Sequence, residues 1–374
     1  MPSLIVHVSV EHPNAVWGGI GTAIDLLVRA ATEEATPTAV LTPLNSALVP
    51  ALEHPVQDIR TSHGLINGPG DFYYAADRLA LGAIISEEMT YLLRRLSTQN
   101  ALQVIIHNEE FLPLIRALRG ARSIDVVYFS HGLAKEEHPG QSRLWDLQRD
   151  VHLEAPQIAV ASTAQSEAVL EISGRQAFVI NLPLAHFVDQ EISNKPLPNE
   201  ILAAGRFVRQ KGFDILIKAL DMIESPPLCR IIAGHGDAEY ERECRGQARD
   251  KSIDIVWLPW NNAADLRASL TRTSCLIMPS RFEPLGLLAA ESIGLGTPVI
   301  GSDVGGLSLL LRAASQVAVP TGVDGPHVQE LAQAIVSRTS RRITVQDRRS
   351  LEVYNSDRTL ANLDSLIRAG EPES

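Results

Sequence analysis

Two basic residues, Arg206 and Lys211, lie five positions apart between glycines in the run G-R-F-V-R-Q-K-G. The apolar run before them predicts that both lie in a loop past the end of a strand. There a planar guanidinium and a point-like ammonium can together hold a diphosphate. Two solvated surface cations would show the same spacing, so the residues alone leave these two interpretations equal.

Two carboxylates, Glu283 and Glu291, lie eight positions apart in a second segment. Glu283 is expected in a strand-to-helix loop, and Glu291 two helical turns later on roughly the same face. A loop carboxylate can accept hydrogen bonds from sugar hydroxyls, and one on the helix can hold a ribose diol. The backbone N–H groups of Leu285, Gly286 and Leu287 would meet a phosphate at the helix start. Two solvated carboxylates are the equal alternative.

A glycine-rich turn follows the first apolar run and includes Gly18, Gly19 and Gly21. Glycines at such a turn let backbone N–H groups approach an anion at the positive end of a helix, so Gly19 and Gly21 are candidates for binding a donor substrate. A tight turn without a ligand is the alternative. The spacing is not G-x-G-x-x-G and does not predict a dinucleotide site.

Further candidates follow other strand-like runs of the first half. Glu109 and Glu110 come after the run that ends at His107, so they are expected at the ligand-binding edge, where they could bind an acceptor. Exposed surface carboxylates are the alternative. His131 follows the run that ends at Ser130, and a hydrogen-bonded core histidine is its alternative. No Asp-x-Asp occurs, so fixed cations rather than a metal are expected to neutralise a diphosphate.

Short runs rich in Val and Ile alternate with helix-like segments, which predicts parallel sheets covered on both faces and an α/β fold class. Helices are expected over residues 21–32 and 84–96. The expected strands are Leu4–Val10, Thr38–Leu41, Gln103–His107, Asp125–Ser130, Gln157–Ser162, Phe178–Asn181, Ile201–Gly205, Leu228–Gly234, Ile253–Leu258, Cys275–Pro279, Pro298–Gly301 and Gln316–Val319.

This series of strands is interrupted once, by a proline-containing segment, which predicts two domains. The expected parts are an N-terminal domain at 1–185, a linker at 186–200, a C-terminal domain at 201–350, and a helix at 351–374 that could cross back to the first domain. Two doubly wound, Rossmann-like domains would place the ends of their strands across a shared cleft.

Composition excludes several classes of protein. The 374 residues are 45% hydrophobic and 21% charged, as in a globular chain. The net charge of −11 argues against binding nucleic acid or stable association with anionic membranes. Three cysteines without a C-x-x-C pair support neither a disulfide framework nor a zinc site. Without an N-terminal leader or a long apolar run, the chain is expected to be cytoplasmic.

Residues 201–311 resemble the nucleotide-binding domain of retaining GT-B glycosyltransferases of family 4. The resemblance rests on G-R-x-x-x-x-K-G, P-S-R-F-E-P-L-G, the E-x7-E spacing and G-T-P-V-I-G-S-D-V-G-G. The first half is similar more loosely, through Gly18–Gly21 and His131. The resemblance implies that Arg206 and Lys211 bind the donor diphosphate, Glu283 the donor sugar and Glu291 the ribose, with His131 near the anomeric centre.

The expected activity is therefore retaining, metal-independent hexosyl transfer from a nucleoside diphosphate sugar, a UDP- or GDP-sugar, to a small soluble acceptor. Residues 1–190 hold 21 acidic and 12 basic side chains, a net charge of −9, which favours a cationic amino sugar or aminocyclitol. Glu109, Glu110 and Glu137 are the candidate acceptor ligands. A GT-B nucleotide-sugar epimerase and a non-catalytic nucleotide-sugar-binding protein are the alternatives.

Overall fold

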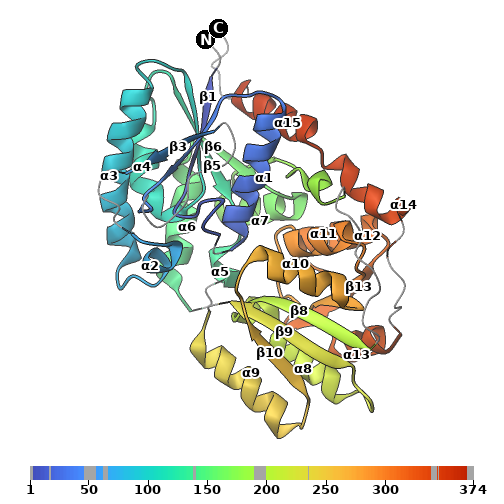
Figure 1. Cartoon of the computed structure of the whole chain (residues 1–374). Helices are drawn as coiled ribbons and strands as arrows, with labels where there is room; N and C mark the ends of the chain where they lie inside the picture. Colours follow the sequence, from blue (N-terminus) through green and yellow to red (C-terminus); the bar gives the residue numbers. More distant parts are fainter. Residues whose placement is uncertain are drawn as a thin grey trace. The chain divides into compact units, whose positions relative to one another are not determined.

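The chain divides into two compact units in the computed structural model, which describes residues 3–16, 18–45, 56–61, 66–137, 140–188, 199–234, 236–337, 343 and 345–368. Unit 1 consists of Met1–Pro183 and Tyr354–Ser374, and unit 2 of Leu184–Val353 (Figure 1). Helix α15 (Ser356–Arg368) therefore belongs to unit 1, where the Thr359 hydroxyl donates to the Asn181 carbonyl. Residues 189–198 of the expected linker lie outside the described residues.

A seven-stranded, all-parallel sheet in the order β3-β2-β1-β4-β5-β6-β7 forms the centre of unit 1. Its strands are β1 (Leu4–Val8), β2 (Thr38–Thr42), β3 (Gln57–Arg60), β4 (Leu102–Ile106), β5 (Ile124–Ser130), β6 (Gln157–Val160) and β7 (Phe178–Val179). Its other helices are α1 (Gly19–Glu33), α2 (Pro69–Tyr73), α3 (Arg78–Leu96), α4 (Leu112–Leu118), α5 (Ala134–Glu137), α6 (Ser142–Glu154) and α7 (Thr163–Ser173), with a 3-10 turn η1 at Glu109–Phe111.

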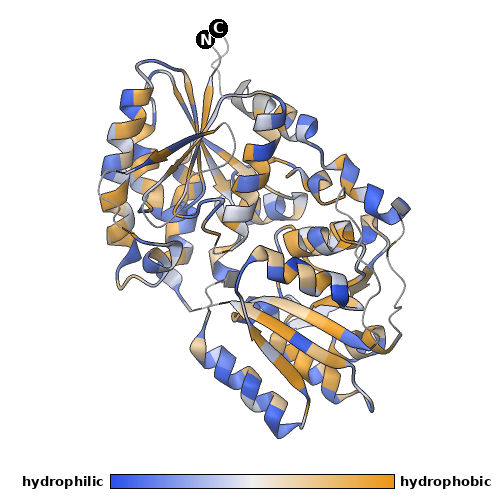
Figure 2. Ribbon diagram, in the orientation of Figure 1, coloured by the Kyte–Doolittle hydropathy of each residue, from blue (hydrophilic) through white to orange (hydrophobic). Residues whose placement is uncertain are grey.

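Helices cover both faces of this sheet because side chains alternate along each strand. On β2, Val40 packs with Ile24 and Val28 of α1. The next residue, Leu41, points to the other face and joins the core that contains Ile85 of α3. In Figure 2 the strands are mostly apolar, while the helices carry polar residues on part of their surface.

Unit 2 repeats the same pattern in six parallel strands, ordered β10-β9-β8-β11-β12-β13. The strands are β8 (Glu200–Arg206), β9 (Leu228–Gly234), β10 (Ile255–Pro259), β11 (Cys275–Met278), β12 (Val299–Ser302) and β13 (Val317–Val319), with a hairpin of β14 (Thr321–Gly322) and β15 (Gly325–Pro326). The helices are α8 (Phe213–Asp221), α9 (Ala238–Asp250), α10 (Ala263–Arg272), α11 (Leu287–Gly294), α12 (Gly305–Ala313), α13 (Val328–Ser337) and α14 (Val345–Arg348), with 3-10 turns η2 (Leu184–Phe187), η3 (Arg209–Lys211) and η4 (Arg349–Val353).

Each sheet has a point where the strand order reverses, between β1 and β4 in unit 1 and between β8 and β11 in unit 2. Open α/β sheets bind ligands beyond the carboxyl ends of the strands at this point. The loops after β8 and β11 are the ones that carry the G-R-x-x-x-x-K-G and P-S-R-F-E-P-L-G segments. The fold therefore brings the two strongest sequence motifs to the edge where ligands bind.

The α/β class with two doubly wound sheets is confirmed, while several element boundaries differ from expectation. The edge strand β3 was not expected, because its sequence Q-D-I-R is largely polar and half-exposed. Helix α3 begins at Arg78 rather than Ile84, since the Asp77 carboxylate accepts a hydrogen bond from the Ala80 N–H and caps the helix. None of the described helices is both long and apolar enough to cross a bilayer.

Candidate functional site

The loops after β8 and β11 of unit 2 are joined by an ion pair between two of the expected site residues. Lys211 Nζ donates to Glu283 Oε2 at 2.7 Å, and Ser280 Oγ donates to the same oxygen at 3.3 Å. The Glu283 residue is only 8% exposed. The structure thus brings together a cation and a carboxylate that lie 72 positions apart in the sequence.

The same two loops approach each other so closely at Gly212 that only glycine fits. Its φ is +68°, and a Cβ at this position would lie 1.9 Å from the Pro279 carbonyl oxygen. A residue with a side chain would therefore be strained and would also push the loops apart. The glycine that ends the G-R-x-x-x-x-K-G run is explained by this contact.

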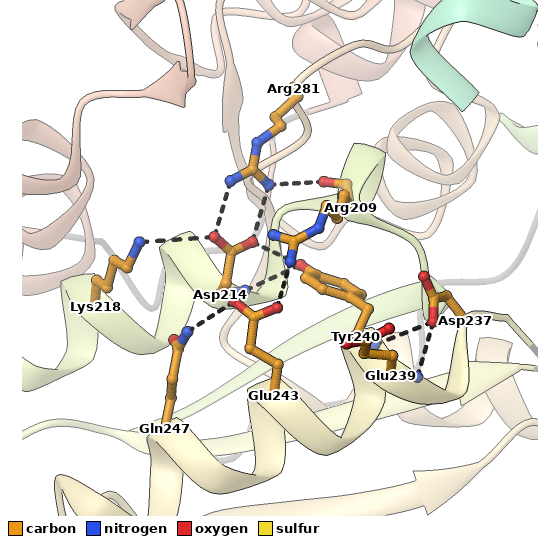
Figure 3. A network of polar contacts seen from close by, with 9 residues as sticks. All are labelled: Arg209, Asp214, Lys218, Asp237, Glu239, Tyr240, Glu243, Gln247 and Arg281. Carbon is orange, nitrogen blue, oxygen red and sulfur yellow. Dashed lines mark hydrogen bonds and ion pairs between the residues drawn. The ribbon is translucent and has the colours of Figure 1, made fainter. Parts of the chain in front are cut away.

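A salt bridge between the partly buried Arg281 and the buried Asp214 joins the two loops (Figure 3). Arg281 binds the Asp214 carboxylate through both terminal nitrogens, at 2.9 and 2.8 Å. The same guanidinium donates to the Arg209 carbonyl at 2.7 Å, and the Arg281 N–H donates to the Gln210 carbonyl at 2.7 Å. Arg281 stands two residues before Glu283 and bonds the turn that ends at Lys211, so it holds both members of the ion pair in place.

Helix α9 supports this salt bridge (Figure 3). The Tyr240 hydroxyl donates to Asp214 at 2.6 Å, and Arg209 pairs with Glu243 at 2.5 Å. Burial alone would raise the pKa of Asp214, but the hydrogen bonds from Arg281 and Tyr240 outweigh it and hold the pKa below its usual value. Asp214 therefore remains an ionised partner for Arg281 at neutral pH.

The first turn of helix α12 holds the backbone of Glu283. The Gly306 N–H donates to the Glu283 carbonyl at 3.1 Å, and a Cβ at Gly306 would lie 2.1 Å from the Pro284 carbonyl oxygen. The expected phosphate-binding residues follow in the chain. Gly286 is the N-cap of α11, with a φ of 89° and no side-chain capping bond, so Leu285 and Leu287 flank a helix start not capped by a side chain.

The other two side chains of unit 2 that are expected to bind the donor are Arg206 and Glu291, which lie on different elements. Arg206 is the last residue of β8 and pairs in register with Gly234 of β9. Glu291 lies on α11, where its carboxylate accepts from Arg267 Nε of α10 at 2.6 Å. Its side chain is 14% exposed. Arg267 is thus a further residue that a ribose-binding role of Glu291 would involve.

In unit 1, a carboxylate of the chain itself occupies part of the expected anion site at the start of α1. Glu11 Oε2 accepts from the Gly18 N–H at 3.0 Å and from the Gly21 N–H at 2.9 Å. The Tyr73 hydroxyl donates to the other oxygen at 3.1 Å. The expectation that Gly21 offers its N–H to a phosphate is therefore corrected, because Glu11 already fills that position. Gly19 is the first residue of α1.

The expected acceptor carboxylates fall into three different situations. Glu110 is ion-paired with Arg78 at 2.9 Å and its side chain is 1% exposed, so it does not face an acceptor, and this expectation is corrected. Burial raises the pKa of Glu110, and Arg78 offsets this only in part. Glu109 begins the 3-10 turn η1 and is half-buried. Glu137 ends α5, and its side chain lies outside the described residues.

His131 follows β5 and is hydrogen-bonded to a second histidine, with 2.7 Å between His107 Nδ1 and His131 Nε2. Burial, with a smaller effect of His7, lowers the pKa of His131 to about 3. The ring is therefore neutral at physiological pH. No cluster of three or more potential metal ligands occurs in the described part of the chain.

Sequence reasoning missed Asp214, Arg281 and Glu11. Arg281 lies inside the recognised run P-S-R-F-E-P-L-G and Asp214 two residues after the end of G-R-x-x-x-x-K-G, so their place beside the site was visible. Their pairing was not, because 67 residues separate them. Glu11 carried a weaker signal, a lone carboxylate seven residues before the first glycine it binds.

Comparison with known proteins relates this site to a family. Residues 187–344, which include every expected site residue of unit 2, match the family model described as "Glycosyl transferases group 1". This part of the chain is therefore similar to group 1 glycosyltransferases. The chain is 27% identical to a D-inositol 3-phosphate glycosyltransferase of Pseudarthrobacter chlorophenolicus, over 85% of this chain and 81% of that protein. It is 26% identical to a glycogen synthase of Mycobacterium tuberculosis, over 81% of this chain and 78% of the relative.

Solved structures show that the chain has the GT-B fold. Sucrose-phosphate synthase from Thermosynechococcus elongatus superposes with a TM-score of 0.75 at 19% identity, covering 98% of both chains. Anabaena HepE, solved with UDP and glucose, gives a TM-score of 0.69 at 17% identity and covers 98% of this chain and 99% of its own. Both similarities extend over the whole chain, so the fold assignment applies to both units.

Proposed function

We propose that this protein is a glycosyltransferase that moves a hexosyl group from a nucleoside diphosphate sugar to a hydroxyl of a small acceptor, with retention of the anomeric configuration and without a metal. The observation that carries the proposal is the Lys211–Glu283 pair at 2.7 Å, held by Arg281 at the strand-order reversal of unit 2. A cation for phosphate oxygens beside a carboxylate for sugar hydroxyls is the arrangement that a sugar diphosphate needs.

In this proposal unit 2, with residues 201–350 as its donor domain, binds the nucleotide sugar. Arg206 and Lys211 hold the diphosphate, aided by the N–H groups of Leu285, Gly286 and Leu287. Glu283 accepts from the sugar hydroxyls, while Glu291 binds the ribose. That HepE was solved with UDP-glucose supports a UDP-sugar donor, with a GDP-sugar as the alternative.

The proposed reaction exchanges one C–O bond for another at the anomeric carbon. The bond to the diphosphate breaks as the acceptor oxygen bonds to the same face of the sugar, and the acceptor proton passes to a phosphate oxygen. Arg206 and Lys211 stabilise the charge that develops on the leaving diphosphate, which fixed cations can do without a metal. In the same proposal, His131 and Gly19 are the residues that unit 1 contributes to the reaction.

Unit 1, with residues 1–185 as its main part, is proposed to bind the acceptor. The net charge of −9 over residues 1–190 supports a cationic acceptor such as an amino sugar or aminocyclitol. Glu109 and Glu137 are the candidate ligands, and Glu110 is excluded by its pairing with Arg78.

A thermal-shift panel of UDP, GDP and ADP with their glucose and mannose derivatives tests donor binding, since a ligand of the native state raises the midpoint. Proton NMR then follows donor consumption and the coupling at the new anomeric carbon, with and without excess EDTA. A retained product formed in EDTA is expected. Inversion, or a need for added magnesium, would contradict the mechanism, and binding without consumption would indicate a non-catalytic protein.

A further inference from the structure

Three histidine rings form an uninterrupted chain across unit 1. His7 Nδ1 lies 3.0 Å from His107 Nε2, and His107 Nδ1 lies 2.7 Å from His131 Nε2. His7 is on β1, His107 follows β4 and His131 follows β5, which are neighbouring strands of the sheet. This row of rings leads from His7 and His107, which are each 1% exposed, to the half-buried His131.

Strand register explains why these residues meet. His7 lies opposite Ile105 on β4, so His107 is two residues farther along the same face. Ile105 in turn lies opposite Val127, which carries the same face through Phe129 to His131. Each histidine is therefore a diagonal neighbour of the next, and long or aromatic side chains reach across such diagonals.

The rings contact each other edge to edge. The interplanar angles are 30° for His7 and His107 and 29° for His107 and His131, with centroid distances of 5.3 and 5.0 Å. In both pairs the centroids lie farther apart than the nitrogens by roughly two ring radii, so the nitrogens point at each other. The Phe129 ring packs against the rings of His131 and His107, with centroid distances of 4.7 and 5.7 Å.

Because the three imidazoles are neutral, the two hydrogen bonds between them must run in the same direction. Burial lowers the pKa of His7 to about 4, and it lowers the pKa of His107 well below the usual value. A neutral imidazole has one N–H donor and one acceptor nitrogen, so both hydrogen bonds form only if the N–H groups all point the same way. The tautomer of each ring is therefore tied to that of the next.

We propose that His107, supported by His7, is a positioning residue that locks the ring plane and tautomer of His131. Nε2 of His131 is engaged by His107, which leaves Nδ1 with one defined role toward a substrate hydroxyl, either donor or acceptor. This inference rests on the proposed function for the part that His131 plays in sugar transfer. The lock itself is a property of the unliganded protein and can be tested without a substrate.

The deciding experiment is long-range ¹H–¹⁵N NMR of the full chain labelled at its 11 histidines, with His131 assigned by its loss in His131→Gln. In the native protein His131 should show the separate nitrogen shifts of one neutral tautomer. In His107→Phe, which keeps an aromatic ring beside Phe129 but removes both nitrogens, the two His131 shifts should converge as the tautomers interchange. His7→Phe should cause a smaller change in the same direction, and it serves if His107→Phe does not fold.

Val104→Ala is the matched control, because Val104 is buried on β4 but faces the opposite side of the strand from His107. It should lower stability and leave the His131 signals unchanged. For the nucleotide sugar consumed in the donor panel, His107→Phe should lower kcat about tenfold or more with KM changed less than twofold.

Native His131 signals already averaged between tautomers, or unchanged signals in His107→Phe, would overturn the inference even if transfer activity is found. Locked signals that converge in His107→Phe would support it even if no transfer is detected, in which case only the proposed function fails.

Discussion

Lys211 is the residue whose chemistry the structure defines best. Its ammonium lies 2.7 Å from the Glu283 carboxylate. Under the proposed function, a diphosphate would therefore meet a cation that is already held in place. Electrostatic stabilisation from such a preorganised group is worth more than the same charge in solvent. The value of the site lies in this preorganisation and not in the number of cations.

Replacing Lys211 by Ala should raise the barrier to transfer by about 2 to 4 kcal/mol, the size of a lost charge-assisted contact to a developing anion. Arg206→Ala should have an effect of the same kind. The measurement is kcat/KM for the consumed nucleotide sugar. Lys251→Ala, which removes another lysine paired with a carboxylate of unit 2, Asp221, is the control. Wild-type kinetics in both site variants would remove the diphosphate assignment.

Buried histidines make the stability of unit 1 depend on pH. Burial lowers the pKa of His7 and His152 to about 4 and that of His131 to about 3. These rings gain a proton only on unfolding, so their contribution is complete above about pH 6.5 and is lost as the pH falls toward 4. Each should contribute a slope of about 1.4 kcal/mol per pH unit in that range.

Hydrogen exchange of strands β1, β4 and β5 at pH 7, 6 and 5, corrected for intrinsic rates, measures this slope for unit 1 alone. His152→Gln should flatten the slope, while His327→Gln, at an exposed position of unit 2, should not. Glu110 has the opposite effect on the pH dependence of stability, because burial raises its pKa. It is one group, however, and it acts against several histidines. Protection that is constant between pH 7 and 5 would show that the histidines are not neutral in the folded state.

At the scale of elements, the loops after β8 and β11 depend on the salt bridge between Arg281 and Asp214. Asp214 is 2% exposed, so removing Arg281 leaves its carboxylate without its main partner. Arg281→Met should therefore cost about 3 kcal/mol of stability and raise the donor KM about tenfold, because both loops lose a shared anchor. Asp214→Asn combined with Arg281→Met should cost less than the sum of the single changes.

The double-mutant cycle is measured by urea unfolding and by donor kinetics in parallel. The matched control is the exposed pair of Arg149 and Asp146 on α6, whose removal should cost less than about 0.5 kcal/mol. Additive effects of Arg281→Met and Asp214→Asn on both stability and KM would show that the pair does not act as a clamp.

Gly212 and Gly246 of unit 2 can be compared to test the close contact between Gly212 and the Pro279 carbonyl. The comparison separates this contact from the ordinary effect of replacing a glycine by alanine. Gly212→Ala should destabilise unit 2 by more than about 1 kcal/mol, because φ is +68° and the added carbon would lie 1.9 Å from a carbonyl oxygen. Gly246→Ala in the interior of α9, where nothing lies within 4 Å, should be neutral or stabilise by up to about 1 kcal/mol. The midpoints of thermal unfolding of the two variants test this prediction, and equal changes in the midpoint would contradict the contact at Gly212.

Much of this arrangement was predictable from sequence because it depends on short-range patterns. Buried parallel strands appear as apolar runs, and the site motifs stand at their ends. For example, residues 275–278 form the apolar strand β11, and Glu283 lies in the loop that follows it. The Asp77 cap and the polar edge strand β3 were missed, since a single cap and a half-exposed strand leave little pattern. Pairings such as Glu11 with Gly21 depend on tertiary contacts that periodicity does not encode.

At the scale of the whole molecule, charge is divided unequally along the chain. The net charge is −11 in total, of which unit 1 (residues 1–183 and 354–374) carries −10 and unit 2 (residues 184–353) only −1. Both units have the same strand order, and the difference in charge is therefore a property of sequence rather than of architecture. The nearly neutral unit 2 suits an anionic donor, and the acidic unit 1 suits a substrate of opposite sign.

A cationic acceptor should therefore bind less well as salt rises. Its KM should increase between roughly 0.1 and 1 M salt, where the screening length falls from about 10 to 3 Å, whereas the KM of a neutral acceptor should not. Glu109→Gln should raise the KM of the cationic acceptor if Glu109 faces it, and Glu87→Gln, at an exposed position of α3, gives the same change in net charge as a control. A mixed panel of amino and neutral sugar acceptors measures both effects. Preference for a neutral or anionic acceptor with a salt-independent KM would show that the acidity of unit 1 serves solvation and not recognition.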